Sequence, residues 1–265
     1  MQFATWNVNS LTVRLPQVLD WLAANPVDVL GLQELKMADE KFPLQAFLDV
    51  GYKASFFGQK TYNGVALLTK SEVSNVVKNI PDFADEQSRV IAATVPSALG
   101  DIRVVNAYFV NGHAPGTDKF EYKMSWLRGM RDYLRAELEA NPRVVVMGDF
   151  NITFDDADSW DPDGLQETIH HTTEERNHLK ALLALGFSDT HRQCHPNPSS
   201  VKAEKTFSWW DYRDFGFKRN RGLRIDYVLA SDALKANVLS CEIDKAPRTN
   251  ERPSDHTPVV MKLQL

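Results

Sequence analysis

The segment Val144-Val145-Val146-Met147-Gly148-Asp149-Phe150-Asn151 indicates which fold class the chain adopts. Its four leading apolar residues are typical of a buried strand, and the polar side chains Asp149 and Asn151 follow where that strand ends. The same order, an apolar run and then an oxygen-bearing side chain, recurs at Asn7 and at Glu34. Oxygen ligands at the ends of strands far apart in the sequence suggest a single metal site.

Short β-type runs alternate with helical patterns along the chain. Apolar residues at helical spacing predict one helix over Leu15–Ala24, before Asn25-Pro26, and a second over Lys119–Ala140, before Asn141-Pro142. Further strands are predicted at Val27–Leu32, Val65–Leu68, Val90–Val95, Ile102–Ala107, Ile225–Leu229 and Val259–Leu263. This alternation favours an α/β fold.

The composition is that of a globular protein. The 265 residues, 43% of them hydrophobic, can bury a full core, and no linker divides them, so we expect one domain over residues 1–265. No apolar run is long enough to span a bilayer, and Met1-Gln2-Phe3-Ala4 does not resemble a signal peptide, so we expect a soluble, cytoplasmic protein without a membrane partner. With only Cys194 and Cys241 available, any bound metal should prefer oxygen ligands.

The formal net charge of −5 argues weakly against a nucleic-acid partner, because phosphate neutralisation needs clustered basic residues. The stretch from Val201 to Ile225 is a local exception. It has seven basic residues against three acidic ones, an excess of four positive charges: Lys202, Lys205, Arg213, Lys218, Arg219, Arg221 and Arg224 against Glu204, Asp211 and Asp214. Six aromatic residues lie among them: Phe207, Trp209, Trp210, Tyr212, Phe215 and Phe217. We expect most of the six to pack in the core and one or two to stack on a ligand.

Towards its C-terminal end the chain reads Pro253-Ser254-Asp255-His256-Thr257-Pro258. A carboxylate next to an imidazole can supply a hard-cation ligand together with a group that handles protons or contacts phosphate. The dipeptide alone is more typical of a polar turn between two prolines. The oxygen ligands at the ends of the other strands favour the metal-site interpretation.

Seven motifs, in this order, resemble those of the exonuclease III family of DNA-repair phosphodiesterases. They are Trp6-Asn7-Val8-Asn9-Ser10-Leu11, Gly31-Leu32-Gln33-Glu34, Gly64-Val65-Ala66-Leu67-Leu68, Tyr108-Phe109, Gly148-Asp149-Phe150-Asn151, Asn220-Arg221-Gly222-Leu223-Arg224-Ile225-Asp226 and Ser254-Asp255-His256. The resemblance implies a four-layer α/β sandwich of the DNase-I-like type, in which two mostly antiparallel twisted sheets are flanked by helices. It also implies a site at one edge of the sandwich, magnesium or manganese, and a double-stranded DNA substrate that is damaged or 3′-recessed.

Hydrolysis of a phosphodiester needs an activated water and positive charge or hydrogen-bond donors on the phosphoryl oxygens. Glu34 is the best candidate for a direct metal ligand, and Asp149 is the candidate to orient or deprotonate the water. A turn after a strand is the other use of Gly-Asp-Phe-Asn. The full expected set of metal-site residues is Asn7, Glu34, Asp149, Asn151, Asp255 and His256.

The resemblance also assigns roles outside the metal site. It implies that Asp226 orients the His256 ring and that Tyr108 contacts the phosphate or the leaving group, although a tyrosine at a strand end is usually a packing residue. The catalytic set implied is Tyr108, Asp149, Asn151, Asp226 and His256. The DNA-contacting set comprises Arg89, His170, Trp209, Arg221, Leu223 and Ile225.

One departure from the family pattern bears on the substrate. His170-His171 stand where related enzymes commonly have a small residue followed by Phe, and His170 then lies near the pocket for an extrahelical abasic sugar. We expect weaker incision 5′ to abasic sites than 3′-5′ exonuclease or 3′-phosphatase activity, unless both histidines are solvated loop residues. The alternatives are a phosphodiesterase acting on inositol phosphates or lipids and a non-catalytic DNA-binding module. A monomer is expected.

Overall fold

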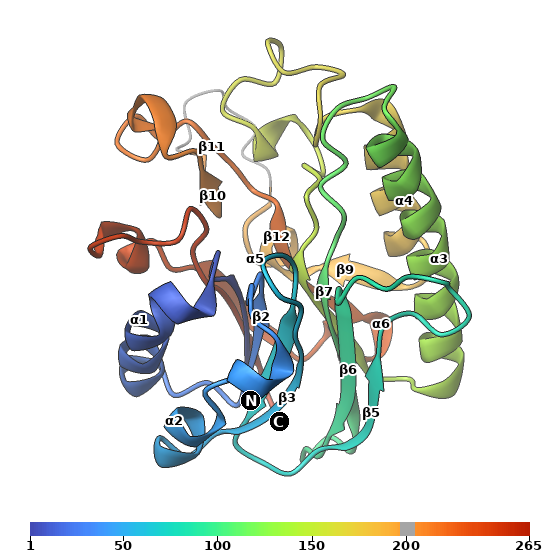
Figure 1. Ribbon diagram of the computed structural model, residues 1–265. Helices are drawn as coiled ribbons and strands as arrows, with labels where there is room; N and C mark the ends of the chain where they lie inside the picture. Colours follow the sequence, from blue (N-terminus) through green and yellow to red (C-terminus); the bar gives the residue numbers. More distant parts are fainter. Residues whose placement is uncertain (197–204) are drawn as a thin grey trace.

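Two six-stranded sheets form the centre of the computed structural model, which describes residues 1–196 and 205–265 (Figure 1). The first sheet has, in spatial order, β13 (Val238–Ile243), β14 (Val259–Leu263), β1 (Gln2–Asn7), β2 (Val29–Gln33), β4 (Val65–Thr69) and β3 (Lys53–Phe57). The second has β5 (Ser74–Lys78), β6 (Val90–Val95), β7 (Ile102–Tyr108), β8 (Val144–Asp149), β12 (Asp226–Ser231) and β9 (Phe187–Asp189). Within each sheet one pair is parallel, β1 with β2 and β7 with β8, and the other pairs are antiparallel.

Helices α1 (Leu11–Ala24) and α2 (Leu44–Asp49) lie on the outer face of the first sheet, and α3 (Asp118–Ala140) and α4 (Thr173–Leu183) lie on that of the second (Figure 1). Two short helices lie elsewhere: α5 (Thr190–Cys194) contacts strands of both sheets, and α6 (Asp232–Lys235) places Leu234 in the apolar cluster between the sheets. Short 3-10 turns are η1 (Asp39–Lys41), η2 (Asp156–Asp158), η3 (Arg213–Phe215) and η4 (Ala246–Thr249), and β10 (Trp209–Trp210) pairs with β11 (Gly222–Leu223). The four-layer α/β sandwich expected from the motifs is confirmed.

Three apolar clusters hold the layers together. One lies between the two sheets, and the other two lie where α1 packs on the first sheet and where α3 and α4 pack on the second. The buried stripe of α3 includes Phe120, Leu127 and Leu134, and the Thr117 side chain caps its first turn by accepting from the amide of Phe120. In residues 1–196 and 205–265 there is no helix with the length and apolar content needed to cross a bilayer.

The predicted boundaries hold closely for most strands but not for the first helix. Helix α1 begins at Leu11 and not at the predicted Leu15, and Pro16 therefore lies inside the helix. The early turn forms because the backbone amide of Leu11 donates to the carbonyl of Leu35 and that of Arg14 to the carbonyl of Ser10. A proline removes only one backbone donor, and in the second helical turn that loss is tolerated here.

The sheet register brings the polar strand ends together. Asn7 is paired with Gln33 at the ends of the parallel strands β1 and β2. In the second sheet Asp149 lies beside Tyr108 on β7 and beside Asp226 on β12. Parallel neighbours end at the same edge of a sheet, so both sheets present their polar termini on one side of the sandwich.

Candidate active site

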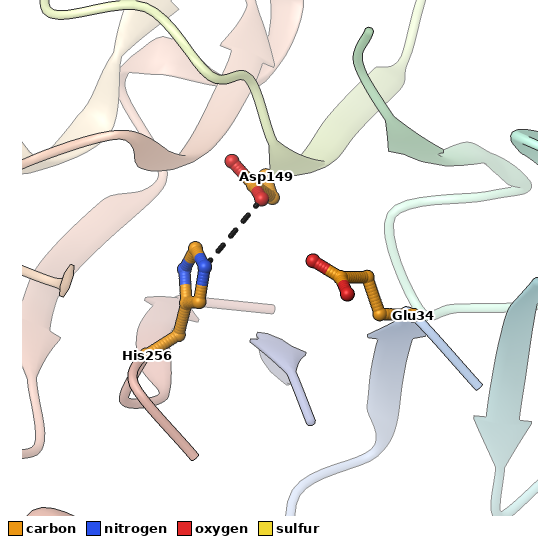
Figure 2. A group of neighbouring side chains, drawn as sticks. All are labelled: Glu34, Asp149 and His256. Carbon is orange, nitrogen blue, oxygen red and sulfur yellow. Dashed lines mark ion pairs between the residues drawn. The ribbon is translucent and has the colours of Figure 1, made fainter. Parts of the chain in front are cut away.

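Glu34, Asp149 and His256 converge at this edge (Figure 2). One ligand atom from each of the three lies within 4.8 Å of the others, and Figure 2 shows the two carboxylates and the imidazole turned towards a common space. Asp149 and His256 are buried, whereas Glu34 is partly exposed. The three residues come from segments separated by more than a hundred positions, which only the fold brings together.

Asn7 holds the two carboxylates side by side. Its Nδ2 donates to Glu34 Oε1 at 2.9 Å and to Asp149 Oδ2 at 2.9 Å, while its Oδ1 accepts from the backbone amide of Asn9. Asn7, which was expected in the metal site, is therefore at the cluster, but it contacts the two carboxylates through its amide nitrogen. Two carboxylates kept this close at a partly exposed edge offer the oxygen ligands that a hard divalent cation prefers.

His256 is fixed by Asp226. The ring Nδ1 donates to Asp226 Oδ2 at 2.9 Å and to Oδ1 at 3.1 Å, so the other nitrogen, Nε2, faces Asp149 Oδ2 at 3.6 Å. Burial alone lowers the pKa of His256, but the carboxylates of Asp226 and Asp149 outweigh it and raise the pKa to about 10. The charged ring therefore directs its Nε2–H donor towards Asp149 and the cluster.

Asp149 sits at the end of β8 because Gly148 permits a close strand approach. A Cβ on Gly148, whose φ is +151, would lie 1.8 Å from the carbonyl oxygen of Ala107. Burial raises the pKa of Asp149, while His256 opposes the rise, and the balance is a pKa of about 7. A carboxylate whose pKa lies near neutrality can accept a proton at physiological pH.

Asn151 lies next to Asp149 in a left-handed conformation with φ 52. Its backbone amide donates to Asp149 Oδ1 at 2.9 Å, and its Nδ2 donates to the carbonyl of Phe109 at 3.0 Å and to Asp149 Oδ2 at 3.3 Å. Asn111 Nδ2 donates to Asn151 Oδ1 at 3.2 Å. Asn151, expected in both the metal-site and the catalytic set, thus lies at the cluster in direct contact with Asp149.

Tyr108 and Arg89 line a cavity of about 500 Å³ beside the cluster. Burial, and then the charge of Glu34, raises the pKa of Tyr108, so its hydroxyl keeps its proton. The Arg89 guanidinium lies 5.1 Å from the Tyr108 ring centroid and donates to Gln87 Oε1 at 2.7 Å. Arg89 is 7% exposed, so it offers much less surface to DNA than a free arginine would.

Asp255, an expected metal ligand, has both carboxylate oxygens in hydrogen bonds outside the group formed by Glu34, Asp149 and His256. Its Oδ1 accepts from Asn9 Nδ2 at 3.0 Å and its Oδ2 accepts from Trp209 Nε1 at 3.0 Å. Among the residues that the structure describes, the acidic and histidine cluster contains its neighbour His256 but not Asp255. The two members of the dipeptide therefore have different partners, since His256 contacts Asp226 and Asp149.

A second cavity, of about 570 Å³, contains most of the expected DNA-contacting residues. His170, Trp209, Arg221 and Leu223 line it, whereas Ile225 is 2% exposed and lies outside the lining. The Arg221 guanidinium stacks on the Trp160 ring at 5.0 Å. The structure therefore places the DNA-contacting candidates on both sides of the cluster, with Arg89 in the smaller cavity.

His170 is not a solvated loop residue. Its Nδ1 is 2.6 Å from the carbonyl oxygen of Asn151, which can only accept, so Nδ1 carries the proton. Burial, with Lys123 nearby, lowers the pKa of His170 to about 3 and keeps the ring neutral. His170 is partly exposed, whereas the neighbouring His171 is buried, and its Nε2 is 3.0 Å from Ser159 Oγ.

Much of the basic stretch serves the fold. Arg224 is fully buried between Asp158 and Asp189, with N to O distances of 2.6 and 2.8 Å. Arg213 pairs with Asp211. Lys202 and Glu204 lie outside the described residues. Among the aromatic residues, Phe207 and Trp210 are buried, Trp209 is half-buried, and Tyr212 and Phe215 are exposed.

Lys123 is a buried residue behind the candidate site that the sequence patterns did not identify. Its Nζ donates to Asn151 O at 2.8 Å and to Asn111 O at 3.1 Å, and it pairs with Glu175 at 2.5 Å, with both side chains fully buried. The lysine follows Phe120 by three positions on the apolar stripe of α3. A lysine on a buried helical face needs a partner, and that signal could have identified it.

A sequence profile of the Endonuclease/Exonuclease/phosphatase family matches residues 4–256. The match includes every residue of the cluster described above. The chain therefore belongs to the Endonuclease/Exonuclease/phosphatase family.

Within this family the chain is similar to nucleases of the exonuclease III type. An exodeoxyribonuclease III from Haemophilus influenzae is 36% identical over 267 residues, covering 98% of this chain and 98% of that protein. A solved structure of a variant of the 3′ phosphatase NExo from Neisseria, bound to a product DNA hairpin, has a TM-score of 0.95 and 43% identity over 100% of both chains. An AP endonuclease from Archaeoglobus fulgidus has a TM-score of 0.93 and 33% identity, again over 100% of both chains. The family expected from the motifs is confirmed.

Proposed function

We propose that this protein is a DNA-repair hydrolase of the exonuclease III type, which cleaves DNA phosphodiesters with a divalent metal ion. The observation that carries this proposal is the cluster of Glu34, Asp149 and the Asp226-oriented His256 at the sheet edge, between two cavities. The names of the related nucleases supply the substrate class. We further propose that residues 1–265 act as one catalytic domain and as a monomer.

Magnesium or manganese is the ion that fits the donor set. Glu34 and Asp149 offer carboxylate oxygens, and Asn7 stands between them, while Cys194 and Cys241 lie elsewhere in the fold. Hard divalent ions prefer such oxygen ligands. A bound ion supplies positive charge to the phosphate and lowers the pKa of an attached water. Glu34 is the proposed direct ligand because it is the partly exposed carboxylate of the pair.

The protein groups divide the remaining work. Asp149 orients or deprotonates the attacking water, since its pKa of about 7 suits a proton acceptor. His256 donates from Nε2 to a phosphoryl oxygen, because Nδ1 is occupied by Asp226. The protonated Tyr108 supplies a further neutral donor at the same edge, and Asn151 Nδ2 supplies another when it gives up its longer hydrogen bond, the one to Asp149.

The cavity lining favours 3′ ends over internal abasic sites. His170 occupies part of the space in which an extrahelical sugar would sit, next to Trp209 and Leu223. Its ring is held by the Asn151 carbonyl and cannot swing out without losing that hydrogen bond. A terminal nucleotide needs no extrahelical pocket, so we propose that 3′-5′ exonuclease and 3′-phosphatase activities exceed abasic incision.

A magnesium assay on two labelled duplexes tests this function. One duplex carries an internal abasic-site analogue, and the other has a recessed 3′ end with a 3′-phosphate. We expect rapid processing of the 3′ end and slow incision 5′ to the internal lesion, with neither reaction in the presence of EDTA. Comparable rates on both substrates would contradict the proposed preference, and hydrolysis of a soluble inositol phosphate without any DNA cleavage would contradict the function itself.

A further inference from the structure

Asp255 and Trp209 are joined by both backbone and side-chain contacts. The indole Nε1 of Trp209 donates to Asp255 Oδ2 at 3.0 Å, and the backbone amide of Trp210 donates to the carbonyl of Asp255 at 3.0 Å. Trp209 and His256 form an isolated β-bridge. Their rings lie edge to face, with the ring centroids 6.5 Å apart. The wall of the larger cavity is therefore attached to the segment that carries the catalytic candidate.

Asn9 fixes the other oxygen of Asp255. Lys36 Nζ, which can only donate, contacts Asn9 Oδ1 and also pairs with Glu34 at 2.9 Å. The oxygen of the Asn9 amide must therefore face Lys36, which leaves Nδ2 to donate to Asp255 Oδ1 at 3.0 Å. Asn9 has a φ of 43, which a short asparagine side chain tolerates. Each oxygen of Asp255 thus has a defined donor.

We propose that Asp255 is a positioning residue for Trp209, and that it holds the indole plane against the DNA bound in the larger cavity. An aromatic side chain has two rotatable bonds, and a hydrogen bond at the ring edge selects one orientation of the plane. A preset ring loses less conformational entropy when a sugar or base packs on it. This inference rests on the proposed function of the chain on DNA.

Electrostatics makes the proposal distinguishable from a role in metal binding. Removing a carboxylate near DNA phosphates should, by charge alone, strengthen DNA binding. Weaker DNA binding after the loss of Asp255 would therefore report a lost geometry and not a lost charge. A metal ligand would instead change the magnesium concentration that half-maximal turnover requires.

The test is a double-mutant cycle on the Kd for the recessed duplex, measured in EDTA. We expect Asp255→Ala and Trp209→Phe each to raise the Kd by about tenfold, the equivalent of one net hydrogen bond. The double variant should be no weaker than either single variant, because both changes remove the same hydrogen bond. Asp255→Asn keeps an acceptor for the indole but turns an NH2 group towards the donor Nδ2 of Asn9, so it should restore only part of the affinity.

The chain offers a matched control in a second indole-carboxylate pair. Trp21 Nε1 donates to Asp244 Oδ2 at 2.8 Å, outside both cavities. Trp21→Phe should leave the Kd unchanged, and thermal unfolding should show that every variant is folded. An unchanged or lower Kd for Asp255→Ala, together with a raised magnesium requirement, would overturn the proposal. Wild-type protein that binds the duplex but never cleaves it would contradict the proposed function, while the Kd comparison would still decide the role of Asp255.

Discussion

At the level of single residues, Asp149 contacts three other polar residues of the candidate site. It accepts from Asn7 and from Asn151 and faces Nε2 of His256. These contacts keep a buried carboxylate in place where two negative charges, those of Glu34 and Asp226, oppose its ionisation. Such an arrangement is typical of a group selected for proton transfer.

We predict that Asp149→Ala lowers kcat by about a thousandfold or more, since it removes the carboxylate proposed to orient or deprotonate the attacking water. DNA binding should be largely unchanged, because a removed carboxylate does not weaken attraction to phosphate. Single-turnover rates and the Kd of the same preparation measure the two effects. Turnover within a few-fold of wild type would show that another group accepts the proton.

His170 lines the larger cavity, and its φ of 72 is a conformation that glycine adopts without strain. We predict that His170→Gly increases incision at an internal abasic-site analogue by about tenfold or more while 3′-end processing changes little. The ratio of the two rates on matched duplexes is the measurement. An unchanged ratio would mean that the imidazole does not obstruct the sugar.

At the level of elements, the ion pair between Lys123 and Glu175 fastens α3 to α4 behind the site. Burial lowers the pKa of Lys123, so the pair depends on close contact with Glu175. The same lysine donates to the carbonyls of Asn111 and Asn151. Packing of the two helices and placement of the catalytic loop are therefore coupled through one side chain.

We predict that Glu175→Gln lowers the free energy of unfolding by about 3 kcal/mol, because it leaves a buried lysine without its counter-charge. The control is Asp132→Asn, which breaks an exposed pair with Arg135 on the same helix and should cost less than about 0.5 kcal/mol. Denaturant titrations at equal protein concentration provide both values. Equal losses in the two variants would show that burial of the pair is unimportant.

Sequence patterns identified the long and strongly apolar elements. The boundaries of β6 and β14 and the C-terminal end of α3 agree with prediction, because each is bounded by a proline or a polar residue. Helix α4 was not predicted, although Thr172 and Glu175 form a capping box that the sequence displays. The exposed edge strand β5 was missed because it lacks a continuous apolar run.

At the level of the whole molecule, stability should depend on pH through buried neutral histidines. Burial, followed by the charge of Arg224, lowers the pKa of His191 to about 4, against about 6.5 in an unfolded chain. The unfolded state therefore binds more protons than the folded state below about pH 6.5. This contribution to stability is complete above pH 6.5 and is lost as the pH falls towards 4.

We predict that the free energy of unfolding falls between pH 6.5 and pH 4.5, with up to about 1.4 kcal/mol per pH unit from this one group. His191→Asn keeps a donor for the carbonyl of Cys241 but does not titrate, so its curve should be shallower. Denaturant titrations across this pH range compare the two proteins. Parallel curves would assign the pH dependence to other groups.

The sequence by itself determined the alternation of helices and strands, the family, and the polar residues at the strand ends. These properties depend on local spacing and on short motifs, which can be read without knowing the neighbours of each segment. Only the tertiary structure showed that Asp255 contacts Trp209 and Asn9 instead of joining Glu34, and that His170 lines a cavity. The direction of a side chain depends on strand register and on distant partners, and neither is encoded in any one segment.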